Sequence, residues 1–450
     1  MDKDPRYIAF LVLLQWHTAS HTLDSALQTH SNMITSLSKK DKNLCNALIF
    51  GVLRHRESID WIIKAFSNTL IEKIKLKPLY LLRLALYQIM YLDRIPVFAA
   101  INTAVEIGKK NGGKQTAGFI NAILRKAARE FTTVPLPDKD DQPALYISIH
   151  YSLPLWLAQR WIQSFGFNPT QDLCKQINTI PMITLRTNCL KVDRPALARH
   201  LEDVVQNIIP TDFAEHGLRF SNPETAIPDL ESFKQGWFQI QDEAAQIVTQ
   251  FLAPKPFETI LDGCAGQGGK TGHIAQLMEN TGTLVALDIE PGKLDSLNIE
   301  ARRLGITNIQ TRALDLIQTT IKDFNTYFDR VLVDAPCTGL GVLQRNPDTK
   351  WKRTRHDIKR LSGRQKKILN AGANLVKPGG LLVYSVCSCE PEENEDVIHA
   401  FLDKRKDFSI DKDSESGKYS ILLTKDGFLK TYPETNNMDG FFAARLKRKS

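Results

Sequence analysis

The sequence predicts a multidomain protein, in which an all-α bundle is followed by a small α+β module and by an α/β domain with a doubly wound parallel sheet. Three observations lead to this fold class. The chain has 450 residues, more than one hydrophobic core usually organises. Apolar residues recur every three or four positions through the first 132 residues. From Asp242 onward, helical stripes alternate with short β-rich runs.

The N-terminal region, residues 1–135, is expected to be a helical bundle. Pro78 opens a segment with a helical period, and proline in a first helical turn costs no hydrogen bond. Two further stripes follow, separated by a break at Asn111-Gly112-Gly113. The three stripes comprise Leu79, Leu82, Leu86 and Ile89; Ile101, Ala104, Val105 and Gly108; and Ile120, Ile123, Leu124 and Ala127.

A linker is expected from Thr132 to Pro143, where three prolines flank a run of Asp and Lys. In the next part, residues 145–240, the run MITLRTN and the run starting at Gly236 have strand character. A helical segment from Arg194 to Val204 lies between them. This pattern favours linker residues plus a small α+β module of the RRM or ferredoxin-like kind.

Residues 241–450 alternate between strand-like and helical segments, the pattern of a doubly wound, Rossmann-like domain. Such sheets bind ligands at the carboxyl ends of their strands. The strand-like runs are TILDGCAG, GTLVALDIE, NIQTRALD, DRVLVDAP, GGLLVYSV and GFFAARLKR.

The amino-acid composition indicates which partners the protein binds and in which cellular compartment it lies. Lys and Arg number 58 against 50 Asp and Glu, a net charge of +8 that suits a polyanion. Seven scattered Cys form no disulfide framework and indicate a reducing cytoplasm. The apolar stretch from Ile8 to Leu14 is too short for a bilayer and follows no cleavable leader, so no membrane partner is expected. Because no metal-ligand spacing occurs, no metal is expected.

A glycine-rich turn from Gly263 to Thr271 directly follows the first strand of the C-terminal domain. Glycine lets a ligand approach the backbone, and the next helix offers free amide groups. A phosphate-binding P-loop would need glycine at Cys264, and a dinucleotide loop would need glycine at Thr271. The remaining candidate ligand of this turn is S-adenosylmethionine (SAM). Asp288, after the next strand, can accept its ribose hydroxyls, although alone it would more simply be a helix cap.

Two cysteines, Cys337 and Cys387, follow strands that are expected to be neighbours, so their thiols would face one crevice. A thiolate suits the methylation of carbon 5 of cytosine, which is a poor nucleophile until a group adds at carbon 6. Taken singly, each cysteine would more simply be a small buried hydrophobe.

Several motifs resemble known families. The first helical region, with LLRLALYQIMYLDRIPVFAAINTAVEIGKK and TAGFINAILRK, resembles the NusB antitermination-factor family, which binds RNA. The motifs GCAGQGGKT, DAPCTGLGVLQRNPDTKW, YSVCSCEPEENE and MDGFFAARLKR resemble the Nop2/Sun family of RNA cytosine-C5 methyltransferases. Together they resemble its bacterial Sun/Fmu branch over nearly the whole chain. The resemblance implies a monomeric enzyme that uses SAM to methylate one cytidine of 16S ribosomal RNA, in the small subunit or its precursor.

The resemblance also implies roles for individual residues. Cys387 would be the covalent nucleophile, Cys337 would assist product release, and Asp334 would hydrogen-bond the base and touch the cofactor. The other cofactor-binding residues would be Asp288, on the ribose, Asp315, and the loop of Cys264, Ala265, Gly266, Gln267, Gly268, Gly269 and Lys270.

Two positions depart from the family pattern, and three alternatives stay open. Val386 stands where the family usually has Thr, and Cys389 stands where it usually has an apolar or small residue. Cys389 could be oxidised together with Cys387 or confuse alkylation experiments.

DNA cytosine methyltransferases use the Pro-Cys position, here Cys337, as nucleophile. A non-enzymatic RNA-binding protein with a decayed catalytic domain would have lost Asp334 or Cys387, and both are present. A methyltransferase that acts on an exocyclic amine would need Pro-Pro-aromatic after Asp334, where this chain has Ala-Pro-Cys.

Basic side chains are candidates for contacts with RNA phosphates, although a solvated helix face would look the same. Alongside the basic residues between Lys352 and Lys367, the apolar residues Ile358, Leu361 and Leu369 form a plausible buried stripe of a helix. The candidates are Lys352, Arg353, Arg355, Lys359, Arg360, Arg364, Lys366 and Lys367, next to Trp351, and, in the helical region, Arg54, His55, Arg56, Lys109 and Lys110.

Overall fold

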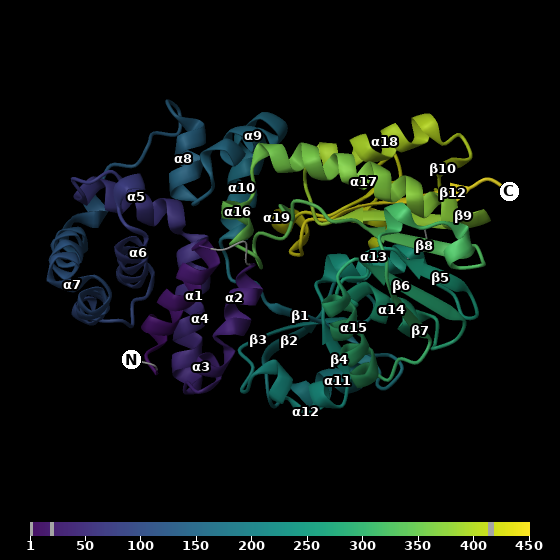
Figure 1. Ribbon diagram of the computed structural model, residues 1–450, viewed down its shortest axis with the longest axis horizontal. Helices are drawn as coiled ribbons and strands as arrows, with labels where there is room; N and C mark the ends of the chain where they lie inside the picture. Colours follow the sequence, from purple (N-terminus) through teal and green to yellow (C-terminus); the bar gives the residue numbers. More distant parts are fainter. Residues whose placement is uncertain (1–2, 19–21, 413–417) are drawn as a thin grey trace. The chain divides into compact units, whose positions relative to one another are not determined.

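The computed structural model describes residues 3–18, 22–412 and 418–450. Its internal contacts divide the chain into two compact units (Figure 1). The first, here called the helical unit, is Met1–Thr179 with Asn346–Lys352. The second, the sheet unit, is Ile180–Arg345 with Arg353–Ser450. No helix within the described residues is long and apolar enough to span a membrane.

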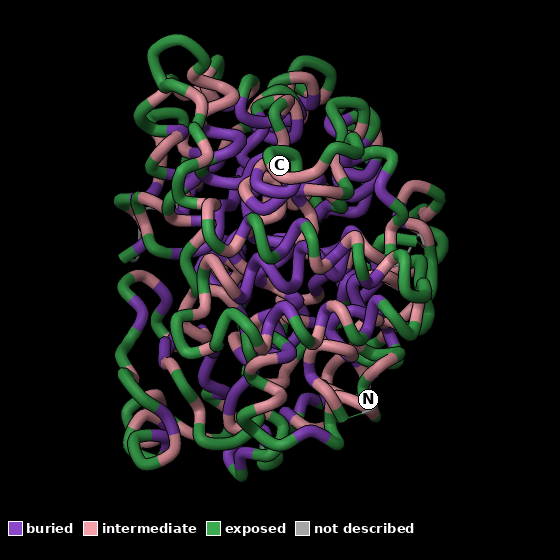
Figure 2. The backbone as a smooth tube through the Cα atoms, turned by 90° about the vertical axis from the view of Figure 1, so that its left-hand side faces the viewer, coloured by how far each residue is buried: buried purple, intermediate pink, exposed green. Residues whose placement is uncertain are grey.

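The helical unit is built around α6 (Leu76–Tyr91), whose apolar side chains are buried along most of its length. The predicted helix break is present at Gly113, where φ is 77° and α7 (Val97–Glu130) is kinked. Buried and exposed positions alternate along the helices in Figure 2, as expected for amphipathic helices. The other helices are α1 (Pro5–Thr18), α2 (Leu23–Thr29), α3 (Ser31–Thr35), α4 (Lys39–Arg54), α5 (Arg56–Phe66), α8 (Pro143–His150), α9 (Leu155–Phe165), α10 (Phe167–Ile177) and α16 (Thr349–Lys352).

The sheet unit begins with a small antiparallel sheet of strand order β2-β3-β1-β4. Its strands are β1 (Ile183–Thr187), β2 (Gln206–Pro210), β3 (Gly217–Ser221) and β4 (Phe238–Ile240). Two helices, α11 (Arg194–Leu201) and α12 (Glu231–Lys234), accompany them. Leu197 and Leu201 of α11 share a core with Leu185, Leu218 and Phe238 of the strands. The boundary between the two compact units, at Thr179 and Ile180, falls inside the predicted range 145–240.

A second, larger sheet follows in the order β10-β12-β9-β8-β5-β6-β7, with β11 paired to β12. The strands from β7 to β9 are parallel, and β12 runs antiparallel to β9, so the sheet is mixed where the sequence predicts parallel strands. The strands are β5 (Thr259–Asp262), β6 (Thr283–Asp288), β7 (Ile309–Ala313), β8 (Phe328–Asp334), β9 (Val376–Val386), β10 (Phe408–Ile410), β11 (Leu429–Lys430) and β12 (Phe442–Arg448).

Helices cover both faces of this sheet, as Figure 1 shows for the sheet unit. One face packs against α13 (Glu243–Leu252), α14 (Gly269–Leu277) and α15 (Pro291–Leu304). The other packs against α17 (Arg355–Leu375) and α18 (Glu395–Lys404). A short helix, α19 (Pro433–Asn436), precedes β12. The predicted fold class is confirmed. From β5 the chain passes to β6 and β7 on one side and then to β8 and β9 on the other, so a switch point lies beside β5.

Candidate active site

The glycine-rich loop lies at this switch point, between the end of β5 and the start of α14. Gly268, the residue before α14, has φ 87°, and a Cβ there would lie 2.5 Å from Leu297 Cγ. Gly266 has φ 55° and open space where its Cβ would be. Both positions therefore favour glycine, and the open space beside Gly266 leaves room for a ligand. The loop also contains Gln267, which is exposed.

Three acidic side chains, each at or just after the end of a strand of the large sheet, have different surroundings. Asp288, at the end of β6, accepts a hydrogen bond from the Gly266 amide at 3.0 Å. Asp262, at the end of β5, is buried, and burial raises its pKa to about 6. Asp315 caps a short 3-10 turn, because its Oδ1 accepts the Ile317 amide at 3.0 Å. Asp262 was not among the predicted site residues, although it ends the strand just before the glycine turn.

A SAM molecule, the cofactor that the resemblance implies, fits these residues. Asp262 Oδ1 is buried and has no hydrogen-bond partner within the described chain, so it can take up a cationic ammonium group. Asp288 is half-buried and has acceptor capacity beyond its two backbone contacts, with the amides of Gly266 and Glu290. The open side of Gly266 leaves space for the ligand.

Asp334 and Lys270 form an ion pair beside this loop. Lys270 Nζ lies 2.6 Å from Asp334 Oδ2, and the Ser385 hydroxyl donates to Asp334 Oδ1 at 2.7 Å. Burial lowers the pKa of Lys270, but the Asp334 charge and the charge of Cys387 raise it, and the net pKa is raised. Lys270 Nζ also lies 5.0 Å from the centroid of the Phe441 ring. The lysine is therefore held charged near Cys387.

Cys337 and Cys387 meet, as the strand order predicts. Strands β8 and β9 are parallel neighbours with Asp334 opposite Ser385. Cys337 lies three residues after the end of β8, and Cys387 directly follows the last residue of β9. Their sulfur atoms lie 3.2 Å apart, and both residues are partly exposed. The hydrogen bond with Cys387, followed by burial, raises the pKa of Cys337 well above its usual value.

The neighbouring cysteines Cys264 and Cys389 are poorly suited to act as nucleophiles. Burial raises the pKa of Cys264, and the charges of Asp262 and Asp334 add to this effect. Burial likewise raises the pKa of Cys389, which is only 5% exposed. A buried thiol with a raised pKa contains little thiolate at neutral pH. Alkylation and oxidation are therefore expected to favour Cys387 over Cys389.

The loop before β12 supports the backbone of Cys387 through Gly341. The Gly341 amide donates to the Cys387 carbonyl at 3.0 Å, and the Gly440 amide donates to the Gly341 carbonyl at 2.8 Å. This chain of contacts links the C-terminal loop to the backbone of the candidate nucleophile.

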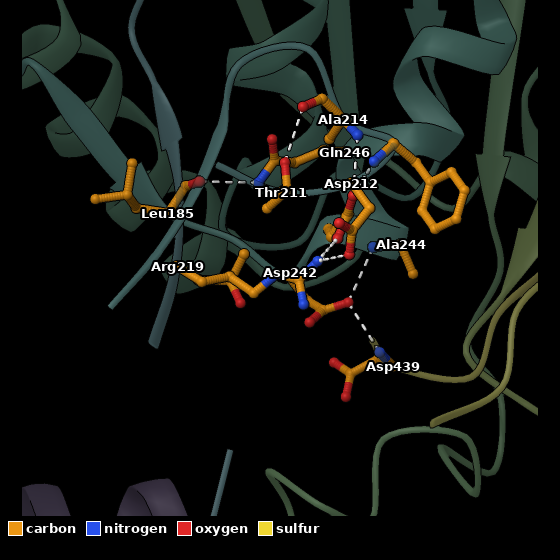
Figure 3. Close-up of polar contacts among 12 residues, drawn as sticks. Leu185, Thr211, Asp212, Ala214, Arg219, Asp242, Ala244, Gln246 and Asp439 are labelled. Carbon is orange, nitrogen blue, oxygen red and sulfur yellow. Dashed lines mark hydrogen bonds and ion pairs between the residues drawn. The ribbon is translucent and has the colours of Figure 1, made fainter. Parts of the chain in front are cut away.

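A partly buried ionic cluster anchors the same loop. Asp242 Oδ1 accepts the amides of Ala244 and Asp439, at 2.9 and 3.0 Å (Figure 3). Arg345 pairs with both carboxylates, at 2.8 Å to Asp242 Oδ2 and 3.4 Å to Asp439 Oδ2. This cluster could not be predicted, since its members are far apart in the chain and none follows a strand of the parallel sheet.

The candidate RNA-contacting residues have different surroundings. On α17, Arg355, Lys359, Arg360, Lys366 and Lys367 are exposed and Arg364 is partly so, above the predicted stripe of Ile358, Leu361 and Leu369, which is buried. Arg353 Nε donates to the Thr338 carbonyl at 2.7 Å. In the helical unit, Arg54 is only 7% exposed, so it is a poor phosphate contact. His55 and Arg56 are partly buried there, whereas Lys109 and Lys110 are exposed.

Comparison with known proteins gives three family matches along the chain. The model described as 16S rRNA methyltransferase RsmB/F matches residues 249–447. The NusB family model matches residues 3–129, and the RsmF/B-like ferredoxin-like domain matches residues 153–227. The three matches follow one another in the order of the predicted domains.

Full-length relatives agree with these matches. The probable ribosomal RNA small subunit methyltransferase B of Bacillus subtilis (strain 168) is 37% identical over 431 residues, which cover 94% of this chain and 95% of the relative. A Synechocystis protein of the same description is 37% identical over 454 residues, covering 98% and 99%. The crystal structure of PH0851 has the same fold, with a TM-score of 0.82 at 23% identity, covering 100% of this chain and 99% of that one. The chain therefore belongs to the RsmB/F family of 16S rRNA methyltransferases.

Proposed function

We propose that this enzyme transfers a methyl group from SAM to carbon 5 of a cytidine in 16S rRNA, through a temporary bond between the Cys387 sulfur and carbon 6 of the base. The observation that carries the proposal is the pair of sulfur atoms 3.2 Å apart, on loops beside Lys270 and Asp334. Family membership supports a ribosomal RNA substrate, and the thiol pair supports the covalent route.

Cys387 suits attack better than Cys337. Its thiolate would lie near the Lys270 ammonium, and the two charges interact favourably. Cys337 holds its proton more tightly because the hydrogen bond with Cys387, and then burial, raise its pKa. The thiol of Cys337 can therefore donate to the Cys387 thiolate.

The reaction then requires three changes at the base. The Cys387 sulfur bonds to carbon 6, and the electron pair released makes carbon 5 nucleophilic. Bound SAM supplies an electrophilic methyl group, which carbon 5 takes up. A base then removes the proton from carbon 5, the bond between sulfur and carbon 6 breaks, and Cys387 leaves as a thiolate, with Cys337 assisting this elimination.

Asp334 is proposed to hydrogen-bond the ring of the target base. Its carboxylate is oriented by Lys270 on one oxygen and by Ser385 on the other. Because a helical RNA stack hides carbon 6, the target cytidine has to be unpaired or turned out of its helix. The basic face of α17 is the proposed contact for the flanking phosphates.

The test replaces Cys387 with alanine and Cys389 with alanine as the matched control. Cys387→Ala should reduce single-turnover methyl transfer to 16S rRNA below about one part in a hundred, because the covalent step is lost. SAM affinity, measured by calorimetry, should stay within about twofold, since Cys387 is not in the glycine loop. Cys389→Ala should remain active. Substantial turnover by Cys387→Ala would exclude it as the nucleophile.

A further inference from the structure

We propose that Glu393 is a positioning residue, which holds the loops of Cys337 and Cys387 together through its buried carboxylate; this inference rests on the function proposed above. Glu393 lies in a 3-10 turn after β9, in the segment Pro391–Glu393. It is fully buried and takes no part in the reaction steps proposed above.

The Glu393 carboxylate joins the residues that directly follow the two cysteines. Its Oε2 accepts the hydroxyls of Thr338 and Ser388, each at 2.5 Å. Its Oε1 accepts the Thr338 amide at 2.9 Å. One carboxylate therefore bonds the residue after Cys337 and the residue after Cys387, whose sulfur atoms lie 3.2 Å apart.

The carboxylate is itself anchored from two further elements. Gln365 of α17 donates to Glu393 Oε1 at 2.9 Å, and the same amide group reaches the Pro336 carbonyl at 3.1 Å. The Tyr384 hydroxyl of β9 donates to the Glu393 carbonyl at 2.6 Å. The side chain and the backbone of Glu393 are thus both held, so small displacements of either cysteine loop are resisted.

The four donors to the Glu393 carboxylate are neutral groups: one amide and one hydroxyl of Thr338, the hydroxyl of Ser388 and the amide of Gln365. Four donors match the acceptor sites of an ionised carboxylate. Neutral donors stabilise this charge without cancelling its field on neighbouring thiols.

That field acts on Cys337. The Cys387 hydrogen bond and burial raise the pKa of Cys337 most, and the Glu393 charge raises it further. A second thiolate 3.2 Å from that of Cys387 would repel it. The Glu393 charge therefore favours the protonated form of Cys337, whose thiol can donate a hydrogen bond to the Cys387 sulfur.

The test uses Glu393→Gln in the full-length enzyme, with Asp396→Asn as the matched control. Both changes remove one carboxylate charge, but Asp396 is exposed on α18. Glutamine cannot accept all four hydrogen bonds, so single-turnover kcat should fall about 10-fold to 100-fold. KM for RNA and the SAM affinity should stay within about threefold. Asp396→Asn should match the wild type.

A second readout separates positioning from simple destabilisation. In the wild type, brief treatment with iodoacetamide, followed by mass spectrometry, should label Cys387 more than Cys337. In Glu393→Gln this preference should shrink at least about threefold, because Cys337 ionises more readily. Asp396→Asn should keep the wild-type preference.

Two outcomes would overturn the inference. One is a Glu393→Gln enzyme with wild-type kcat and wild-type labelling. The other is a loss of kcat matched by an equal loss of SAM affinity with the labelling preference unchanged, which indicates general damage. If Glu393→Gln fails to fold, Ser388→Ala removes one of the same hydrogen bonds and should reduce kcat and the labelling preference in the same direction. Failure of the proposed function itself would appear differently, as a wild-type enzyme that forms no 5-methylcytidine.

Discussion

The reactivity proposed for Cys387 depends on neighbours from separate parts of the sheet unit. Lys270 comes from the first turn of α14, Cys337 from the loop after β8, and Gly341 from further along that loop. Each has a different proposed part: the Lys270 ammonium would favour the thiolate and the Cys337 thiol would donate to it, while the Gly341 amide donates to the Cys387 carbonyl. The candidate nucleophile is therefore held through both its sulfur atom and its backbone.

Gly341→Ala should damage this support. A Cβ at Gly341 would lie 2.0 Å from the Gly440 carbonyl oxygen, so the backbone of one loop has to move. We expect the free energy of unfolding to fall by about 1–3 kcal/mol and methyl transfer to fall at least about 10-fold. Urea denaturation and single-turnover assays check these values.

Gly363→Ala is the control for this prediction. Gly363 is exposed within α17 and has open space around its Cβ position. Alanine there should leave activity intact and stabilise the helix by up to about 1 kcal/mol. If Gly341→Ala behaves like Gly363→Ala, the close approach of Gly341 and Gly440 does not support the site.

At this scale, sequence reasoning finds residues that directly follow a parallel strand or a glycine turn. Asp288, Asp334, Cys337 and Cys387 can be picked out in this way, and the structure brings the last three together with Lys270. Their chemical roles remain predictions. Ser385, Asp439 and Glu393 could not be found, because their importance arises from contacts with distant residues such as Asp334, Arg345 and Thr338.

Among the elements, α16 has an unusual connection. The chain leaves the sheet unit after Arg345, contributes residues 346–352 to the helical unit, and returns at Arg353. Lys350 of α16 is fully buried, and its ammonium donates at 3.1 Å to the carbonyls of Arg54 and Ser152 and to Asn178 Oδ1. These acceptors are neutral, and burial lowers the pKa of Lys350 to about 7.

Lys350 should therefore give the helical unit a pH-dependent stability. Between about pH 7 and pH 10 the unfolded chain still binds this proton and the folded chain does not, so the free energy of unfolding rises with pH. Lys350→Met removes the titration. The free energy of unfolding of the wild type minus that of this variant should rise from pH 7 to pH 9, by roughly 1 kcal/mol per pH unit.

Tryptophan fluorescence during urea unfolding measures this difference, since five of the six Trp residues lie in the helical unit. Lys109→Met, at an exposed site on α7, is the control and should show a difference independent of pH. A difference for Lys350→Met that stays constant from pH 7 to pH 9 would show that Lys350 does not titrate as described.

The helices and strands themselves were largely predictable, because the spacing of their apolar residues is clearly helical or strand-like. The helical stripes, the break at Gly113 and the strands of the large sheet follow the sequence pattern. The antiparallel direction of β12 could not be predicted, because a strand's hydrophobic pattern reads the same in both directions. The docking of residues 346–352 was also unpredictable, since Lys350 and Trp351 look like surface residues in the sequence.

For the whole molecule, a helical unit, a ferredoxin-like sheet and a methyltransferase sheet occur in one chain of net charge +8. A net positive charge favours association with RNA and makes the affinity sensitive to salt. The proposed activity changes one base of a long RNA, so its effect can be read directly in cellular RNA.

Loss of the gene should remove one modified cytidine from 16S rRNA. Bisulfite sequencing of total RNA from a deletion strain should show one 16S position that changes from protected to converted. Wild-type enzyme supplied in trans should restore the protection, and the Cys387→Ala enzyme should not. A deletion strain with an unchanged bisulfite pattern would refute cytidine carbon 5 as the target.

The most direct test of the covalent mechanism is to identify the residue that bonds to RNA. Cys337→Ala should slow product release, so that incubation with SAM and unmodified 16S rRNA accumulates a protein–RNA adduct that survives a denaturing gel. After nuclease and protease digestion, mass spectrometry should find a methylated cytidine nucleotide on the peptide that contains Cys387. A nucleotide on any other residue, or methylated RNA formed by this variant without any adduct, would contradict the account.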